Sequence, residues 1–187
     1  IALEYQALLR RLERGKSLVV GGSIVTEDLL LTALSEVDLA GGCDLIISDD
    51  ERNLQDFRAG LMDLLVLDDP MYLYDLEEVK WEEVAEDSLL HVDRGPRYLR
   101  FKYGAQRIGF KHLDAQGTKY AIEGTVRSVP ALLDSGLSFF INESLAIKKG
   151  LRLKTATSSR YLSHKISAVY LEDTREIIRL VQALKRH

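Results

Sequence analysis

The chain has 187 residues and a mass of 21.1 kDa, which corresponds to one large domain or two small lobes. Hydrophobic residues make up 46% and charged residues 29%, so a mainly disordered or low-complexity chain is excluded. The net charge of −4 argues against a nucleic-acid-binding surface on this segment. A single cysteine, Cys43, excludes an internal disulfide and a cysteine-based metal site, and it favours a reducing compartment.

No apolar run is long enough for a helix that spans a bilayer, and no secretory signal follows Ile1. We therefore expect no membrane association and a cytoplasmic location. Because the first residue is not methionine, we expect the chain to be a processed product or a piece of a longer protein.

The first 16 residues predict an amphipathic helix, either a connector from an upstream domain or a helix docked on its own core. The next fifty residues alternate short apolar strands with helices, and this order predicts a parallel sheet covered on both faces. Strands are expected at Ser17–Gly22, Cys43–Ser48 and Asp63–Leu67, and helices at Leu29–Val37 and Glu51–Gly60.

The alternation of strands and helices stops after Pro70, and the acidic stretch Tyr72–Asp87 is interpreted as a connecting segment. Strands are then expected at Ser88–Val92, Tyr120–Glu123, Leu137–Ile141 and Lys165–Leu171, and helices at Gly104–Leu113, Ser128–Asp134 and Asp173–Lys185. Two α/β lobes fit this pattern, joined near Asp68–Tyr74 and again before Lys165.

Four motifs in chain order resemble a known family. The most specific is a helix that ends in Gly60 and is followed by Asp63, which opens the third strand. The motifs are Val19–Thr26, Leu54–Val66, Val129–Ile141 and Lys165–Lys185. Together they resemble the effector-binding domain of LysR-type transcriptional regulators and, more widely, the type 2 periplasmic-binding-protein fold. The resemblance covers the chain from about Ser17 onward. It departs from the family at Asn142-Glu143, where a proline is usual, and in the basic segment Arg97–Gly117.

The resemblance implies an α/β fold of two lobes, each a mostly parallel sheet flanked by helices. It divides the chain into a linker helix (1–16), lobe I (17–72 and 165–187) and lobe II (73–164). It also implies a small-molecule effector in the cleft between the lobes, a homodimer or higher assembly, and DNA binding only through a domain upstream of Ile1.

Ligands of open parallel sheets bind at the carboxyl ends of the strands, beside helix N-termini that favour anions. In lobe I, Ser23 and Thr26 lie at such an end and are candidates to bind a small anion; their alternative role is helix capping. Asp68, with Asp69, is a candidate for a cationic ligand group, and its alternative role is a solvated hinge turn before Pro70.

In lobe II, Thr125 and Ser128, with Arg127 between them, form a second hydroxyl-bearing helix start. Their alternative is a simple cap beside a solvated arginine. Tyr103 is the remaining ligand-binding candidate. The alternative is that Tyr103, Gln106 and Arg107 form a basic surface patch.

The residues give no catalytic or metal-binding pattern. The four histidines lack metal-ligand spacing, and no nucleophile with a base, paired-glutamate pattern or phosphate loop occurs. His91 is expected in the core and Cys43 as a buried thiol. We therefore expect no catalytic residue, no metal and no cofactor.

Three functions remain open from the sequence. The first is the effector-binding domain of a transcription regulator; the second is a solute-binding protein of a transporter; the third is an enzyme on the same fold. A small carboxylate, an amino acid or an oxyanion all remain possible ligands, and an anion is expected.

Overall fold

The computed structural model describes all residues except 1–4, 7–8, 10–11, 13–16 and 40, so the helix expected over 1–16 falls mostly outside the described residues. The chain forms two compact units. Unit 1 comprises Ile1–Ala85 and Lys165–His187, and unit 2 comprises Glu86–His164. The chain passes between them within β4 (Lys80–Val92) and within β8 (Ser163–Tyr170).

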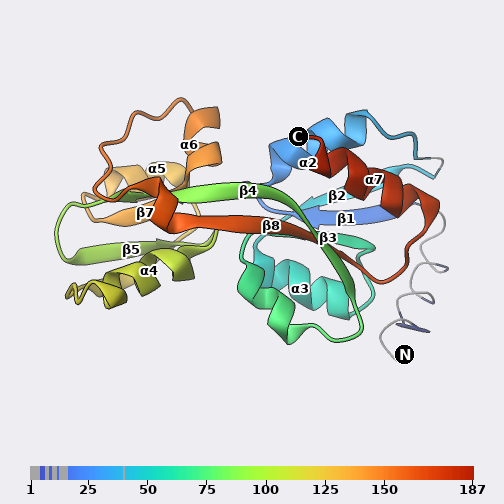
Figure 1. Ribbon diagram of the computed structural model, residues 1–187, viewed down its shortest axis with the longest axis horizontal. Coiled ribbons are helices and arrows are strands. Elements are labelled where there is room, and N and C mark those ends of the chain that lie inside the picture. The colour runs from blue at the N-terminus through green and yellow to red at the C-terminus, as the bar shows by residue number, and fades with distance from the viewer. Residues whose placement is uncertain (1–4, 7–8, 10–11, 13–16, 40) are drawn as a thin grey trace. The chain divides into compact units, whose positions relative to one another are not determined.

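The sheet of unit 1 has the strand order β2-β1-β3-β8 (Figure 1). β1 (Leu18–Gly22) pairs in parallel with β2 (Cys43–Ile47) on one side and with β3 (Leu64–Leu67) on the other. β8 runs antiparallel to β3. The parallel arrangement expected from the alternating strands and helices is therefore confirmed for the first three strands.

Helices cover both faces of this sheet (Figure 1). α2 (Glu27–Ser35) and α7 (Arg175–Lys185) pack on one face, and α3 (Asp50–Arg58) packs on the other. The apolar stripe of α7 is buried in this core, with Ile177 and Leu184 almost inaccessible to solvent. It therefore stabilises unit 1 itself rather than offering a free apolar face.

The strand β3 lies at the centre of unit 1 and is completely buried. Leu64 and Val66 face the core that α2 and α7 cover, whereas Leu65 and Leu67 face Phe57 of α3. Successive side chains of a strand point to opposite faces, so a strand covered on both sides must be apolar throughout. Each such side chain stabilises the fold by about 1.5–3 kcal/mol.

The expectation of a connecting segment over Tyr72–Asp87 is wrong. This stretch begins in the 3-10 helix η1 (Pro70–Asp75) and then enters β4, a strand of 13 residues whose first part belongs to unit 1. The acidic side chains in that part point mostly to solvent while Val84 is buried. With one fully buried apolar side chain before Asp87, the alternation that marks a strand is weak. Unit 1 therefore continues to Ala85 instead of ending at residue 72.

Unit 2 contains two strand pairs. β4 pairs antiparallel with β7 (Phe139–Asn142), and β5 (Arg97–Phe101) pairs in parallel with β6 (Ala121–Val126). The sequence predicted β6, β7 and the second half of β4 but not β5. β5 mixes large apolar side chains with two arginines directly after a Gly-Pro turn, and without strict alternation its sequence shows a basic stretch more clearly than a strand.

Three α-helices and a short 3-10 helix complete unit 2. α4 (Gln106–Ala115) and α5 (Val129–Asp134) were expected from the sequence. α6 (Glu143–Lys148) and the 3-10 helix η2 (Ser159–Leu162) were not expected, because they are too short to show a helical period and lack the capping side chain and the early proline that mark the similarly short α5.

An aromatic cluster forms the core of unit 2, and His91 belongs to it as expected. The His91 ring stacks on Phe140 at 4.7 Å between ring centroids. Its Nδ1 lies 2.9 Å from Thr157 Oγ1 and its Nε2 lies 2.7 Å from Tyr98 Oη. Burial lowers the pKa of His91, so the imidazole stays neutral and its two nitrogens hold the core to the segment that contains Thr157.

We predict that Gly109→Ala destabilises the chain by about 1–3 kcal/mol, because a Cβ there would lie 2.6 Å from the Phe140 ring. Urea unfolding measures the loss, and Gly124→Ala is the matched control because its Cβ would meet Leu99 only at 3.9 Å. A Gly109→Ala chain as stable as the unaltered one would contradict this packing.

Candidate functional site

One candidate site lies in unit 1, at the carboxyl ends of β1 and β3, where ligands of such sheets bind. Ser23 follows β1 and Asp68 follows β3, and the two side chains meet: Ser23 Oγ donates a hydrogen bond to Asp68 Oδ2 at 2.7 Å. Ser23 Oγ also accepts from the backbone N–H of Val25 at 3.1 Å. Both side chains are buried, so this contact forms away from bulk solvent.

Thr26 closes the turn that follows β1. Its Oγ1 accepts a hydrogen bond from the backbone N–H of Ser23 at 3.0 Å. Thr26 occupies the N-cap position of α2, but its side chain makes no capping hydrogen bond to that helix. The expected alternative of simple helix capping is therefore wrong for Thr26, whose hydroxyl stabilises the turn instead.

Asp50 joins this cluster from the first turn of α3. Its carboxylate accepts from the backbone N–H groups of Asp68 at 3.1 Å and Asp69 at 3.0 Å. Burial and the nearby charge of Asp68 raise the pKa of Asp50 well above its ordinary value. The expected solvated hinge turn at Asp68 and Asp69 is therefore wrong, because both side chains are buried and the turn is held by protein groups.

Two further contacts fix the edge of the sheet. Asp49 caps α3 by accepting from the N–H of Arg52 at 3.0 Å. Asn53 Nδ2 donates to the carbonyl of Gly22 at 2.9 Å, and its buried Oδ1 has no hydrogen-bond partner among the described residues. The polar groups of this edge are thus rich in acceptors, which suits a ligand that carries a hydrogen-bond donor.

Unit 2 has a candidate site of its own, at the carboxyl ends of β5 and β6. Tyr103 follows β5, and its ring packs edge-on against Phe101 at 5.2 Å. Gln106 is buried, and its Nε2 donates to the carbonyl of Phe140 at 2.9 Å and to that of Tyr103 at 3.3 Å. The expected surface patch is wrong for Gln106, which fixes the turn that carries Tyr103.

Asn142 is a further candidate site residue, which the sequence analysis did not assign. It is buried at the end of β7, and its Nδ2 donates to Asp87 Oδ2 at 3.1 Å. Its Oδ1 has no hydrogen-bond partner among the described residues. Asp87 also accepts from the N–H and the Oγ of Ser144, so it holds the start of α6. The signal available was an asparagine directly after the apolar strand Phe-Phe-Ile.

Gly104 allows this asparagine to approach the turn after β5. Its φ of +84° is in the left-handed region, and a Cβ at this position would lie 1.9 Å from Asn142 Oδ1. Glycine is therefore required here by both the backbone conformation and the space.

Thr125 and Ser128 lie at the end of the neighbouring strand. Thr125 is an exposed residue of β6 that pairs with Arg100 of β5. Ser128 is the N-cap of α5, and its Oγ accepts from the N–H of Ala131 at 3.3 Å. The structure thus brings Ser23, Thr26 and Asp68 together in unit 1, and it places Tyr103, Thr125 and Ser128 after or at the ends of two paired strands in unit 2.

Within the described part of the chain, no group of three or more histidine, cysteine or acidic side chains could hold a metal ion. In the same residues, no helix is both long and apolar enough to cross a membrane.

No protein-family model and no curated protein sequence matches this chain. Solved structures do match. A sulfate-bound variant of the OxyR2 regulatory domain from Vibrio vulnificus superposes with a TM-score of 0.68 at 14% identity, over 91% of this chain and 95% of that one. The apo regulatory domain of HypT from Salmonella typhimurium matches with a TM-score of 0.68 at 11% identity, over 91% and 94%. CbnR, a LysR family transcriptional regulator, matches with a TM-score of 0.61 at 14% identity, over 90% of this chain and 68% of that one.

These matches define the class of fold: a mixed α/β, periplasmic-binding-protein-like fold of the kind found in LysR-family regulatory domains. The fold that the four sequence motifs predicted is confirmed.

We predict that Asp50→Asn stabilises the chain at pH 7.5 by an amount on the order of 1 kcal/mol. Its raised folded-state pKa means that the native chain loses stability as pH rises through that value, while the amide retains an acceptor for the N–H groups of Asp68 and Asp69. This increase in the free energy of unfolding should become smaller toward pH 4. Urea unfolding at both pH values tests this, with the exposed Asp44→Asn as control; a gain independent of pH would contradict it.

We also predict that Cys43 is a slow nucleophile. Burial, with the charges of Asp44 and Asp63, raises its pKa to about 11. The thiolate is therefore scarcer at pH 8 but more nucleophilic, which leaves alkylation about tenfold slower than for an ordinary thiol. Iodoacetamide labelling of the folded chain, compared with the same chain in urea, measures the ratio; equal rates would contradict the prediction. Cys43 is half-buried rather than fully buried as expected.

Proposed function

We propose that this chain is the small-molecule effector-binding domain of a transcription regulator. The observation that carries the proposal is a fold of the LysR regulatory-domain kind with buried polar side chains at the carboxyl ends of its strands. The matched structures are regulatory domains, which favours sensing over solute transport or catalysis.

We propose that Ser23, Thr26 and Asp68 form the ligand contacts of unit 1. Ser23 Oγ already donates to Asp68, and Thr26 Oγ1 already donates to the carbonyl of Ser23 at 3.4 Å. Neither hydroxyl is a ready donor to an anion unless the ligand displaces these bonds. The effector therefore combines an anionic group with a donor such as an amine or a hydroxyl, and that donor bonds to the Asp68 carboxylate.

In unit 2, Tyr103, Thr125 and Ser128 are the proposed contacts, and Asn142 is added to them. The buried Oδ1 of Asn142 is an acceptor with no hydrogen-bond partner among the described residues. Buried polar atoms of native proteins are nearly always satisfied, so an acceptor left open at a strand end is a suitable anchor for a ligand donor.

The wider regulator is also part of the proposal. Full-length CbnR has been solved in complex with its target DNA, and by analogy this chain would act on DNA through a domain outside residues 1–187. A homo-oligomer remains a prediction that rests on the family resemblance. A cytoplasmic location and the absence of catalytic activity remain predictions from the residue pattern of the sequence.

The test is calorimetric titration of small carboxylates and amino acids against the unaltered chain, Ser23→Ala and Asp68→Asn. We expect an amino acid or hydroxy acid to bind, with about tenfold or greater loss of affinity in each variant, because a buried hydrogen bond is lost. Ser35→Ala is the control, since it removes an exposed hydroxyl from the end of α2, the helix that follows Ser23.

Equal affinity in the unaltered chain and in Ser23→Ala would contradict the assignment of the site. A turnover that disappears in Asp68→Asn while binding is retained would favour an enzyme instead.

A further inference from the structure

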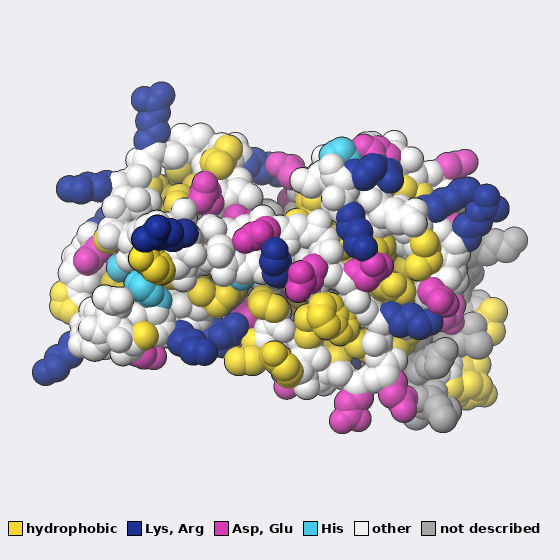
Figure 2. Space-filling model, viewed as in Figure 1, with side chains coloured by type: hydrophobic (Ala, Val, Ile, Leu, Met, Phe, Trp, Pro, Cys, Tyr) yellow, Lys and Arg dark blue, Asp and Glu magenta, His cyan; other side chains and the backbone are white. Residues whose placement is uncertain are grey.

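Charge is divided unequally between the two units. Unit 2 holds 13 of the 25 basic side chains but only 7 of the 29 acidic ones, which gives it a net charge of +6 against −10 for unit 1. On the face drawn in Figure 2, lysine and arginine side chains project from the part of the molecule that contains unit 2. The overall charge of −4 hides a basic unit that attracts anions.

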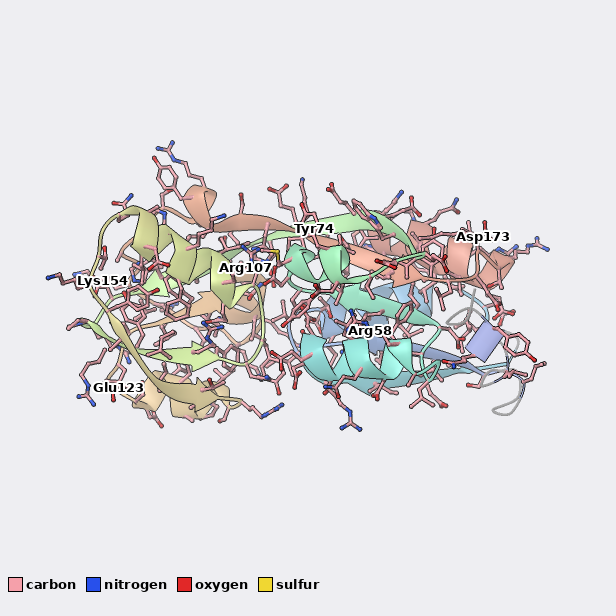
Figure 3. All side chains as sticks on the ribbon, turned by 90° about the horizontal axis from the view of Figure 1, so that it is seen from below. Arg58, Tyr74, Arg107, Glu123, Lys154 and Asp173 are labelled. Carbon is pink, nitrogen blue, oxygen red and sulfur yellow. The ribbon has the colours of Figure 1, made fainter. Side chains whose placement is uncertain are left out.

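A hollow of about 340 Å³ lies in this basic unit, between the end of β4 and the coil that follows α6. Its charged lining consists of Arg94, Arg152 and Lys154, with one acid, Asp93. The labelled Lys154 can be followed in Figure 3. Asp93 Oδ1 accepts from the N–H of Gly95 at 3.0 Å, so part of its acceptor capacity is already used.

The cation Arg94 is held in place by two contacts. Its Nη1 donates to the carbonyl of Leu133 at 3.0 Å, and its guanidinium lies over the Phe139 ring, 5.3 Å from the centroid. A guanidinium has five N–H donors, so most remain for a ligand. Its orientation is fixed before any ligand arrives, which lowers the entropy cost of binding.

Arg152 and Lys154 are exposed, and no ion pair within the described part of the chain neutralises them. Other exposed cations do have acidic partners: Arg97 pairs with Glu123, and Lys80 pairs with Asp173. Three cationic residues therefore line one hollow together with a single acidic residue.

We propose that this hollow binds a small phosphorylated anion, a second ligand separate from the effector. Guanidinium groups bind phosphate oxygens in pairs, and three cations match the charge of a diphosphate group. The volume suits a small molecule. The hollow adjoins the turn that leads into β5, whereas Tyr103 follows the other end of that strand, so the two sites lie at opposite ends of β5.

The experiment is calorimetric titration of inorganic pyrophosphate at constant ionic strength. We compare the unaltered chain with the double variant Arg152→Gln/Lys154→Gln. The control is Lys111→Gln/Lys149→Gln, which removes the same charge from exposed positions of unit 2 outside the hollow. We expect saturable binding, at least tenfold weaker in the first double variant and unchanged in the control. Thermal unfolding checks that both variants fold.

Absence of saturable binding, or an equal loss in the two double variants, would overturn the proposal, because the attraction would then be the general field of the unit. Duplex DNA of arbitrary sequence is titrated in parallel. Binding of the duplex without binding of pyrophosphate would also overturn it, in favour of a nucleic-acid contact. Affinity for carboxylates or amino acids is measured separately, so the fate of the effector site does not decide this result.

Discussion

Complete burial of β3 is the constraint on which unit 1 depends. Its four residues are apolar and are covered on both faces, so the chain can return to polar groups only at the two ends of the strand. An aspartate stands at each end. Asp63 accepts from the N–H of Val19 at 2.8 Å and sets the start of β1 beside β3. Asp68 accepts from Ser23 and ties the far ends of the same strands together. The length of the apolar strand β3 therefore determines where the polar residues at the edge of the sheet lie.

That edge carries more negative charge than a buried site normally tolerates. Asp50 and Asp68 lie close enough for one to raise the pKa of the other, and the main compensation is the set of backbone N–H groups directed at Asp50. Two buried carboxylates this close together are stable when one of them retains its proton or when a hydrogen-bond donor from outside the chain contacts them. The recognition proposed for unit 1 thus depends on the same carboxylates as its stability.

Most of unit 1 could be predicted from the sequence because its strands are short apolar runs and because α3 and α7 begin at the capping side chains of Asp49 and Thr174. β5, α6 and the first half of β4 could not, since each either is too short for a period or exposes most of its side chains. The candidate site residues were likewise only partly predictable from the sequence. Ser23, Thr26 and Asp68 follow strand ends and were identified as candidates, but their mutual hydrogen bonds join residues up to 45 positions apart. Asn142 was not predicted as a candidate because its position depends on tertiary contacts with Asp87 and Gly104, which no local sequence pattern reveals.

The close approach of Gly104 to Asn142 has a consequence for tracing the ancestry of such chains. Pairwise identities of 11–14% to the structures described above leave sequence comparison with little to align. Residue 104 must be a glycine because its backbone is left-handed and because Asn142 fills the space where a Cβ would lie. A search for a glycine and an asparagine 38 positions apart, with the asparagine at the end of an apolar strand, would therefore look for this particular turn and not only for the fold.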